Sequence, residues 1–102
     1  MENEEYEVKV GRHLADLIPS FMDSRRKELE ALNVAFSRGD GGELRKLAHR
    51  MTGFAASYGF ERMAQLGTEL EAAARRGDHD AVASLLLAYD DYLRRVRIKI
   101  AD

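Results

Sequence analysis

Residues 39–58, GDGGELRKLAHRMTGFAASY, decide the fold class of this chain. Gly39 can adopt the left-handed conformation that ends a helix, and Asp40 can cap the next helix, with Glu43 at the spacing of a capping box. From Glu43 to Tyr58 the apolar residues recur every three or four positions, which is the period of one helix face. The stretch therefore predicts a helix end, an N-cap and an amphipathic helix in direct succession.

The same signals continue along the rest of the chain. Gly59 and the pair Gly77-Asp78 are further stop signals, and Pro19 suits the first turn of a helix. We expect a short N-terminal helix over residues 6–17 and longer helices over residues 19–37, 43–58, 61–76 and 80–100. The apolar faces of the longer helices carry the candidate core residues Phe21, Met22, Leu29, Leu32, Phe36, Leu44, Leu47, Ala48, Met51, Ala55, Tyr58, Met63, Leu66, Leu70, Ala73, Ala74, Val82, Leu85, Leu86, Tyr89, Leu93, Val96 and Ile100.

These elements define the expected architecture. No period-2 alternation stands out, so we expect no strand. Short connections place successive helices side by side and in reversed direction. The prediction is an all-α fold, an antiparallel four-helix bundle with an additional short N-terminal helix. A length of 102 residues and a hydrophobic fraction of 45% fit a single domain over residues 1–102.

Composition excludes several classes of function. The absence of cysteine excludes disulfides and thiolate metal sites, and a net charge of −2 argues against nucleic-acid binding. The three histidines are scattered, so we expect no metal site. No apolar run approaches the roughly 18 residues that span a membrane. Residues 1–5 are acidic, the reverse of a secretory signal, and we expect a cytoplasmic protein.

One face of the helix over residues 43–58 does not fit a plain bundle. His49, Thr52, Gly53 and Ala56 form a stripe about 100° round the helix from the core position Ala48. A glycine inside a helix costs roughly 1 kcal/mol relative to alanine. Gly53 is explained either by close helix packing within the protein or by docking of another protein beside His49.

Charged residues complete the candidate site. Lys46 and Arg50, together with Arg45 and Arg62, are expected within reach of an anion at His49. If the next helix packs antiparallel, its flank with Gly67 and Glu71 meets the His49 stripe. Glu71 would then accept a hydrogen bond from one imidazole nitrogen, orient the ring and leave the other nitrogen as a nucleophile.

The run over residues 49–60, His-Arg-Met-Thr-Gly-Phe-Ala-Ala-Ser-Tyr-Gly-Phe, resembles the signature of the histidine phosphotransfer (HPt) domains of bacterial phosphorelays. His49, Met51, Gly53 and Gly59 match that signature, and the resemblance continues through residues 66–71 and over nearly the whole chain. It implies a helical bundle whose exposed histidine accepts a phosphoryl group from the aspartyl phosphate of a receiver domain and passes it to another receiver.

The resemblance also implies roles for single residues. His49 is the phosphorylated nucleophile and Glu71 orients it. The residues expected to support the phosphoryl group or the partner are Lys46, Arg50, Thr52, Gly53 and Gly67, with both glycines leaving room for the partner. The domain has no kinase or nucleotide-binding activity and no cofactor of its own, because the Mg²⁺ belongs to the receiver. Receiver domains are the expected partners, and a monomer is the expected state.

One position departs from the family pattern. The lysine that usually follows the histidine by three residues is Thr52 here. Thr52 can still donate a hydrogen bond, and Arg45, Lys46 or Arg50 can supply the charge. The departure leaves an alternative open, a non-catalytic helical module that binds a receiver or kinase domain without being phosphorylated.

Overall fold

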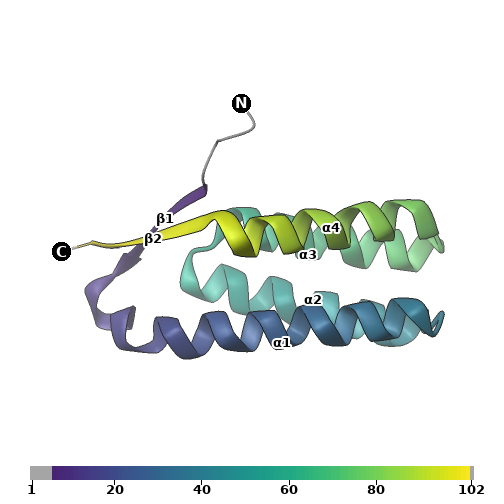
Figure 1. The fold of residues 1–102 in the computed structure, drawn as a ribbon, viewed down its shortest axis with the longest axis horizontal. Coiled ribbons are helices and arrows are strands. Elements are labelled where there is room, and N and C mark those ends of the chain that lie inside the picture. The colour runs from purple at the N-terminus through teal and green to yellow at the C-terminus, as the bar shows by residue number, and fades with distance from the viewer. Residues whose placement is uncertain (1–5, 102) are drawn as a thin grey trace.

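The structure is a computed structural model that describes residues 6–101. The acidic segment over residues 1–5, and residue 102, lie outside the described residues. In chain order the elements are strand β1 (Tyr6–Gly11), the 3₁₀ helix η1 (Arg12–Leu17), helices α1 (Ile18–Ser37), α2 (Gly41–Tyr58), α3 (Glu61–Arg76) and α4 (His79–Arg95), and strand β2 (Val96–Ala101). The described chain is mostly helical, and the four α-helices form one elongated bundle (Figure 1).

The helix boundaries follow from their caps. The Asp40 carboxylate accepts a hydrogen bond from the Glu43 backbone N–H at 3.0 Å, and the Asp78 carboxylate accepts one from the Ala81 N–H at 3.1 Å. Gly39 and Gly77, which precede the two aspartates, have φ of 68° and 69°. The predicted stop-and-cap signals are confirmed, because glycine reaches this conformation without the steric penalty of a Cβ.

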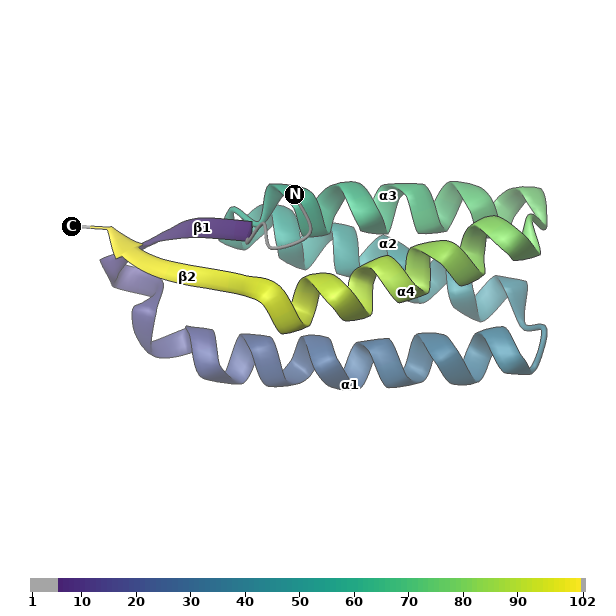
Figure 2. The ribbon, with the colours of Figure 1, turned by 45° about the horizontal axis from the view of Figure 1, so that its top comes forward.

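Contacts between side chains give the relative direction of the helices. His49 near the middle of α2 meets Glu71 late in α3, whereas Thr52 faces Gly67, so the two helices run in opposite directions. In Figures 1 and 2, α1 and α4 lie in front of α2. The core between the helices consists of apolar and aromatic side chains, and its largest fully buried members are Tyr89, Tyr92, Phe60, Leu32, Met51, Met63, Leu66, Leu70 and Val10.

A two-stranded parallel sheet corrects the prediction at both ends of the described chain. β1 pairs with β2 in the register from Tyr6 opposite Val96 to Gly11 opposite Ala101. The N-terminal helix predicted over residues 6–17 is therefore wrong over β1, and only η1 is helical. The helix predicted to reach Ile100 ends instead at Arg95.

The physical reason is visible in the two strand sequences. Both β1, Tyr-Glu-Val-Lys-Val-Gly, and β2, Val-Arg-Ile-Lys-Ile-Ala, alternate apolar and charged residues and contain β-branched side chains. Each segment is too short to stand alone, and the pairing joins residues from opposite ends of the sequence. The Lys99 ammonium and the Glu7 carboxylate lie 3.2 Å apart across the ladder.

Helix α1 buries two charged side chains that the apolar pattern did not predict. Arg25 is 6% exposed and Glu28 is 9% exposed. The Arg25 Nε lies 3.5 Å from the Glu28 carboxylate, an ion-pair distance without hydrogen-bond geometry, and the Tyr89 hydroxyl donates to that carboxylate at 3.2 Å. The Arg25 guanidinium also lies 4.6 Å from the centre of the Phe54 ring. This network links α1, α2 and α4. Among the described residues, no helix is long and apolar enough to cross a membrane.

Candidate functional site

His49 lies on the exposed flank of α2, beside α3. Its side chain is 76% exposed, and its Nδ1 is 3.3 Å from a carboxylate oxygen of Glu71, which is only 22% exposed. When Nδ1 carries the proton, it donates to Glu71, and Nε2 is left with a lone pair. The two residues that the sequence analysis paired are therefore adjacent, and the arrangement presents an oriented, solvent-accessible nitrogen nucleophile.

Arg75 extends this arrangement, although the sequence analysis did not include it. The Arg75 guanidinium donates to the second carboxylate oxygen of Glu71 at 3.3 Å, one helical turn along α3. The side chains of His49, Glu71 and Arg75 thus form one linked series. The signal in the sequence was the Glu-to-Arg spacing of four residues, which places both side chains on the same helix face. This spacing alone did not place Arg75 near His49, because that placement depends on how α3 packs against α2.

Thr52, which replaces the lysine of the family pattern, turns toward its own helix. Its hydroxyl donates to the Ala48 carbonyl oxygen at 3.0 Å and is partly buried. The hydroxyl is therefore already used in a backbone hydrogen bond one turn earlier. In this rotamer Thr52 is a packing residue between α2 and α3 rather than a donor presented to a group on His49.

Gly67 is buried against that same turn of α2, which corrects its expected role. A Cβ built on Gly67 meets the Thr52 hydroxyl and lies 3.1 Å from both the Ala48 carbonyl oxygen and the Thr52 nitrogen. Its glycine permits the close approach of the two helices. It does not leave room for a partner, because the space beside it is filled by α2.

Gly53 has the opposite environment. It is exposed, and no described atom lies within 4 Å of a Cβ built there. Of the two explanations left open above, helix packing within the described protein is therefore wrong. The remaining explanation is an open surface beside His49, one turn along α2, where side chains are small or absent.

The predicted basic residues lie in different places around the bundle. The Lys46 ammonium, 69% exposed, lies one turn before His49 on α2 and 3.7 Å from the Glu43 carboxylate. Arg50 acts on the other flank, near Glu28 of α1: burial raises the pKa of that carboxyl, and the Arg50 charge offsets only part of the rise. Arg62 lies in the first turn of α3 and lines a groove with β1, remote from the level of His49. Lys46 and Arg75 thus flank the His49–Glu71 pair, and the exposed Arg45 also lies one turn before His49 on α2.

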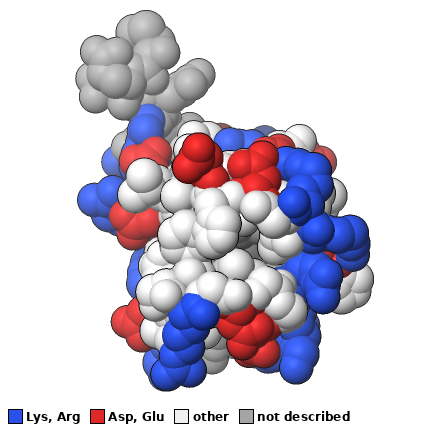
Figure 3. Space-filling view, turned by 90° about the vertical axis from the view of Figure 1, so that its right-hand side faces the viewer, with Lys and Arg blue, Asp and Glu red and all other residues white. Residues whose placement is uncertain are grey.

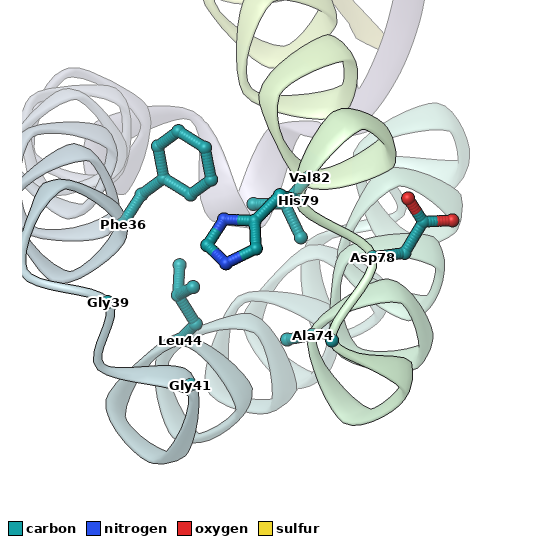
Figure 4. A pocket seen from close by; sticks show the side chains of 9 residues that line it. Phe36, Gly39, Gly41, Leu44, Ala74, Asp78, His79 and Val82 are labelled. Atoms are coloured by element: carbon teal, nitrogen blue, oxygen red, sulfur yellow. The ribbon is translucent and has the colours of Figure 1, made fainter.

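The other two histidines lie in different environments. The His13 ring covers Gly11, and the His79 ring packs on Phe36 with ring centres 5.7 Å apart. His79 and Phe36 point into a cavity of about 140 Å³ between the α1–α2 and α3–α4 connections, whereas the Asp78 carboxylate points away (Figure 4). At this end of the bundle the charged side chains surround an uncharged centre (Figure 3). Within residues 6–101, no three His, Asp or Glu side chains are grouped to hold a metal ion.

Comparison with known proteins agrees with this geometry. A family model described as the Hpt domain matches residues 16–99. No curated protein and no solved structure matches the chain. The matched residues include all four α-helices, His49, Glu71 and Arg75. Because the match covers well over half of the sequence, the chain belongs to the Hpt domain family, the histidine phosphotransfer domains of phosphorelays.

Proposed function

We propose that this protein is a phosphoryl carrier that accepts a phosphoryl group on His49 from the aspartyl phosphate of one receiver domain and passes it to another. The observation that carries the proposal is the exposed His49 ring with Nδ1 facing Glu71 at 3.3 Å. A cytoplasmic location, antiparallel packing of all four helices, and the absence of kinase activity and of a resident cofactor are part of the proposal. The Mg²⁺ required for transfer would be held by the receiver.

The transfer step needs little from this chain beyond position and charge. The Nε2 lone pair forms the N–P bond while the P–O bond to the receiver aspartate breaks, and the aspartate leaves as a carboxylate. The ring keeps its proton on Nδ1 and gains positive charge. Glu71 stabilises that charge through the Nδ1 contact and holds Nε2 in line with the incoming phosphorus.

The transferred group brings negative charge that the missing family lysine would otherwise balance. We assign this role to Arg75, with Lys46 as the second cation. Arg75 is 63% exposed and contacts the same Glu71 carboxylate that contacts His49, and we propose that it turns toward the phosphoryl group by a change of side-chain rotamer. A guanidinium suits this role because its planar donors match phosphate oxygens. Thr52 contributes to packing, as its hydrogen bond to Ala48 indicates.

The receiver would dock over the open part of α2 around His49 and Gly53. Phe54, 44% exposed, borders this surface and rests on the buried Arg25 guanidinium. An exposed aromatic ring that is held in place loses little conformational entropy when a partner covers it. Because Gly53 is exposed and has no side chain, nothing at this position obstructs a receiver that brings its aspartyl phosphate to the imidazole.

The decisive experiment is phosphotransfer from a panel of phosphorylated receivers to the wild type and to His49→Gln. We expect acid-labile, base-stable label on the wild type only, with equal helical content in both proteins by circular dichroism. Label on the His49→Gln variant would contradict the assignment of the site.

Binding without phosphorylation is the second candidate function, favoured by the absence of a cation at position 52. Calorimetry with the same receivers separates the two candidates. Tight binding that is unchanged in His49→Gln, with no phosphohistidine on the wild type, would replace the carrier function by that of a binding module.

A further inference from the structure

An apolar surface lies between α1 and α4. A groove of about 480 Å³ runs between these helices and is lined by Asn33, Phe36, Ala83, Leu86, Leu87 and Asp90. Leu87 on its rim is 71% exposed, the largest exposed fraction among the large hydrophobic residues described, and Val34 on α1 is 47% exposed. The exposed Leu87 side chain and the groove therefore lie next to each other in one apolar patch. A single exposed leucine would need no explanation, but an apolar patch often marks a binding surface.

This patch is separate from the candidate phosphorylation site. His49 and Glu71 belong to α2 and α3, whereas Figure 1 shows α1 and α4 in front, on the side toward the viewer. On α1 the patch begins at Asn33, about two helical turns beyond Arg25, on which Phe54 of the proposed docking surface rests. Any partner on the α1–α4 surface would leave His49 accessible.

In place of the monomer expected from the resemblance, we propose that the α1–α4 surface binds a second copy of this chain in a two-fold symmetric dimer, with the two α4 helices antiparallel and crossing at Leu87. In such an interface the same patch is used by both subunits, so it must be complementary to itself. The patch meets that condition, because Leu87 of each copy can enter the groove beside Leu86 and Phe36 of the other.

The charges along α4 favour this occupant over an unrelated partner. Asp80 lies seven residues before Leu87 and Arg94 lies seven after it, so the three side chains share one helix face. The Arg94 guanidinium already pairs with Asp90 of its own helix at 3.0 Å, and both side chains are largely exposed. Antiparallel pairing about Leu87 brings Asp80 of the other copy to this pair as a second carboxylate for Arg94. Ser84 and Asp90, three residues on either side, likewise meet as donor and acceptor. A parallel arrangement would instead place like charges together, so charge complementarity selects the antiparallel two-fold pair.

Sedimentation of the purified protein tests the dimer. Over concentrations from about 1 µM to about 1 mM, we expect the weight-average mass to rise toward twice that of one chain. Leu87→Glu should keep the mass of a single chain throughout that range and retain full labelling of His49. Leu17→Glu is the matched control, because Leu17 is also an exposed leucine, 48% exposed, but lies in η1, and it should associate as the wild type does. A wild type that stays a single chain at the highest concentration, or a Leu87→Glu variant that still dimerises, would overturn the proposal.

A charge reversal tests the symmetry. Asp80→Arg and Arg94→Asp should each weaken association on the order of tenfold or more, because each opposes like charges across the axis. The double variant restores opposite charges only if the partner is a second copy in the antiparallel arrangement, so its association should recover. Both charges also complement the dipole of α4 itself, and Arg94→Asp removes the ion pair with Asp90 within the same helix. Urea unfolding of each variant therefore separates lost helix stability from lost association. A double variant that unfolds as the wild type does but fails to recover association contradicts the two-fold pairing.

Discussion

At the scale of single residues, the site depends on three side chains in series. His49 contacts Glu71, and Glu71 contacts Arg75, each at 3.3 Å. Glu71 therefore divides its two carboxylate oxygens between the His49 ring, the proposed nucleophile, and the Arg75 guanidinium. In the proposed function, a phosphoryl group on Nε2 would offer the guanidinium a second acceptor. The rate of transfer should then respond to Arg75 more than to any other basic residue.

Arg75→Ala tests this point. We expect transfer to His49 to slow roughly tenfold, since removal of one exposed donor removes part of the charge stabilisation in the transition state. The rate constant of transfer is measured from reactions with one phosphorylated receiver that are quenched at successive times. Arg76→Ala is the control, because Arg76 pairs with Asp78 instead, at 3.5 Å, and its rate should equal that of the wild type. Equal rates for both variants would remove Arg75 from the mechanism.

The two helical glycines near His49 make opposite predictions for stability. Gly67→Ala should lower the free energy of unfolding by about 1–3 kcal/mol, because the added methyl group overlaps Thr52 and crowds the Ala48 carbonyl. Gly53→Ala should raise it by roughly 1 kcal/mol, because its Cβ meets open space and alanine favours the helix. Urea unfolding measures both values. If both variants change the free energy of unfolding in the same direction, the inferred difference in packing between Gly67 and Gly53 is wrong.

Gly53 also tests the docking surface. Gly53→Gln should abolish transfer from a receiver by obstructing its approach to His49, while leaving the fold intact. Gly53→Ala, with a far smaller side chain at the same position, is the matched control and should keep most of the transfer. The assay is again labelling of His49, and normal transfer to Gly53→Gln would contradict docking at this face.

At the scale of elements, the helices are bounded by local chemistry. Each of α2 and α4 begins with an aspartate that accepts a backbone hydrogen bond three residues on, and each follows a glycine in the left-handed conformation. The two junctions, Arg38-Gly39-Asp40 and Arg76-Gly77-Asp78, have the same three residues. This repetition explains why the boundaries of both helices were readable within a few residues.

Removing one cap measures its contribution. Asp78→Ala should lower the free energy of unfolding by about 1 kcal/mol, as expected for loss of an N-cap, and Asp78→Ser should recover most of that loss because a hydroxyl can accept the same hydrogen bond. Thermal or urea unfolding of the three proteins provides the comparison. If the serine variant is as unstable as the alanine variant, the lost stability comes from the Arg76–Asp78 ion pair rather than from the N-cap.

At the scale of the whole molecule, a buried polar network joins three helices. Burial raises the pKa of Glu28 above its usual 4.5, although the Arg25 charge, the Tyr89 hydrogen bond and the Arg50 charge act in the opposite direction. Burial likewise raises the pKa of Tyr89, so its hydroxyl stays a donor to Glu28. The folded state therefore holds a proton on Glu28 more tightly than the unfolded chain does.

The sign of the pH dependence follows from that difference. The contribution of Glu28 to stability is fully present below about pH 4.5 and decreases as the pH rises through the folded-state pKa. Relative to Glu28→Gln, which has no titrating group there, the wild type should lose free energy of unfolding as the pH increases from about 4 to about 8. Urea unfolding of both proteins across this range tests the prediction. A difference that grows in favour of the wild type with rising pH would contradict it.

The sequence by itself determined the four main helices, the glycine and aspartate junctions, and the exposed flank with His49. These features depend on neighbours within one or two helical turns, and the corresponding patterns are long enough to be read. The sequence also predicted that Glu71 lies beside His49, given the assumption that α3 packs antiparallel to α2, and the structure shows this contact. The buried charges of Arg25 and Glu28 interrupted the apolar pattern of α1 and were not expected inside the core.

Only the tertiary structure decided the rest. β1 and β2 are far apart in the sequence and pair with each other. Each has a five-residue alternation of apolar and charged residues that is also compatible with the end of a helix. Their mutual pairing makes both segments strands. Gly67 acquired a packing role, and Arg75 a place beside His49, because α3 lies close against α2. Each of these outcomes depends on contacts between distant segments, which hydrophobic periodicity within a single helix does not encode.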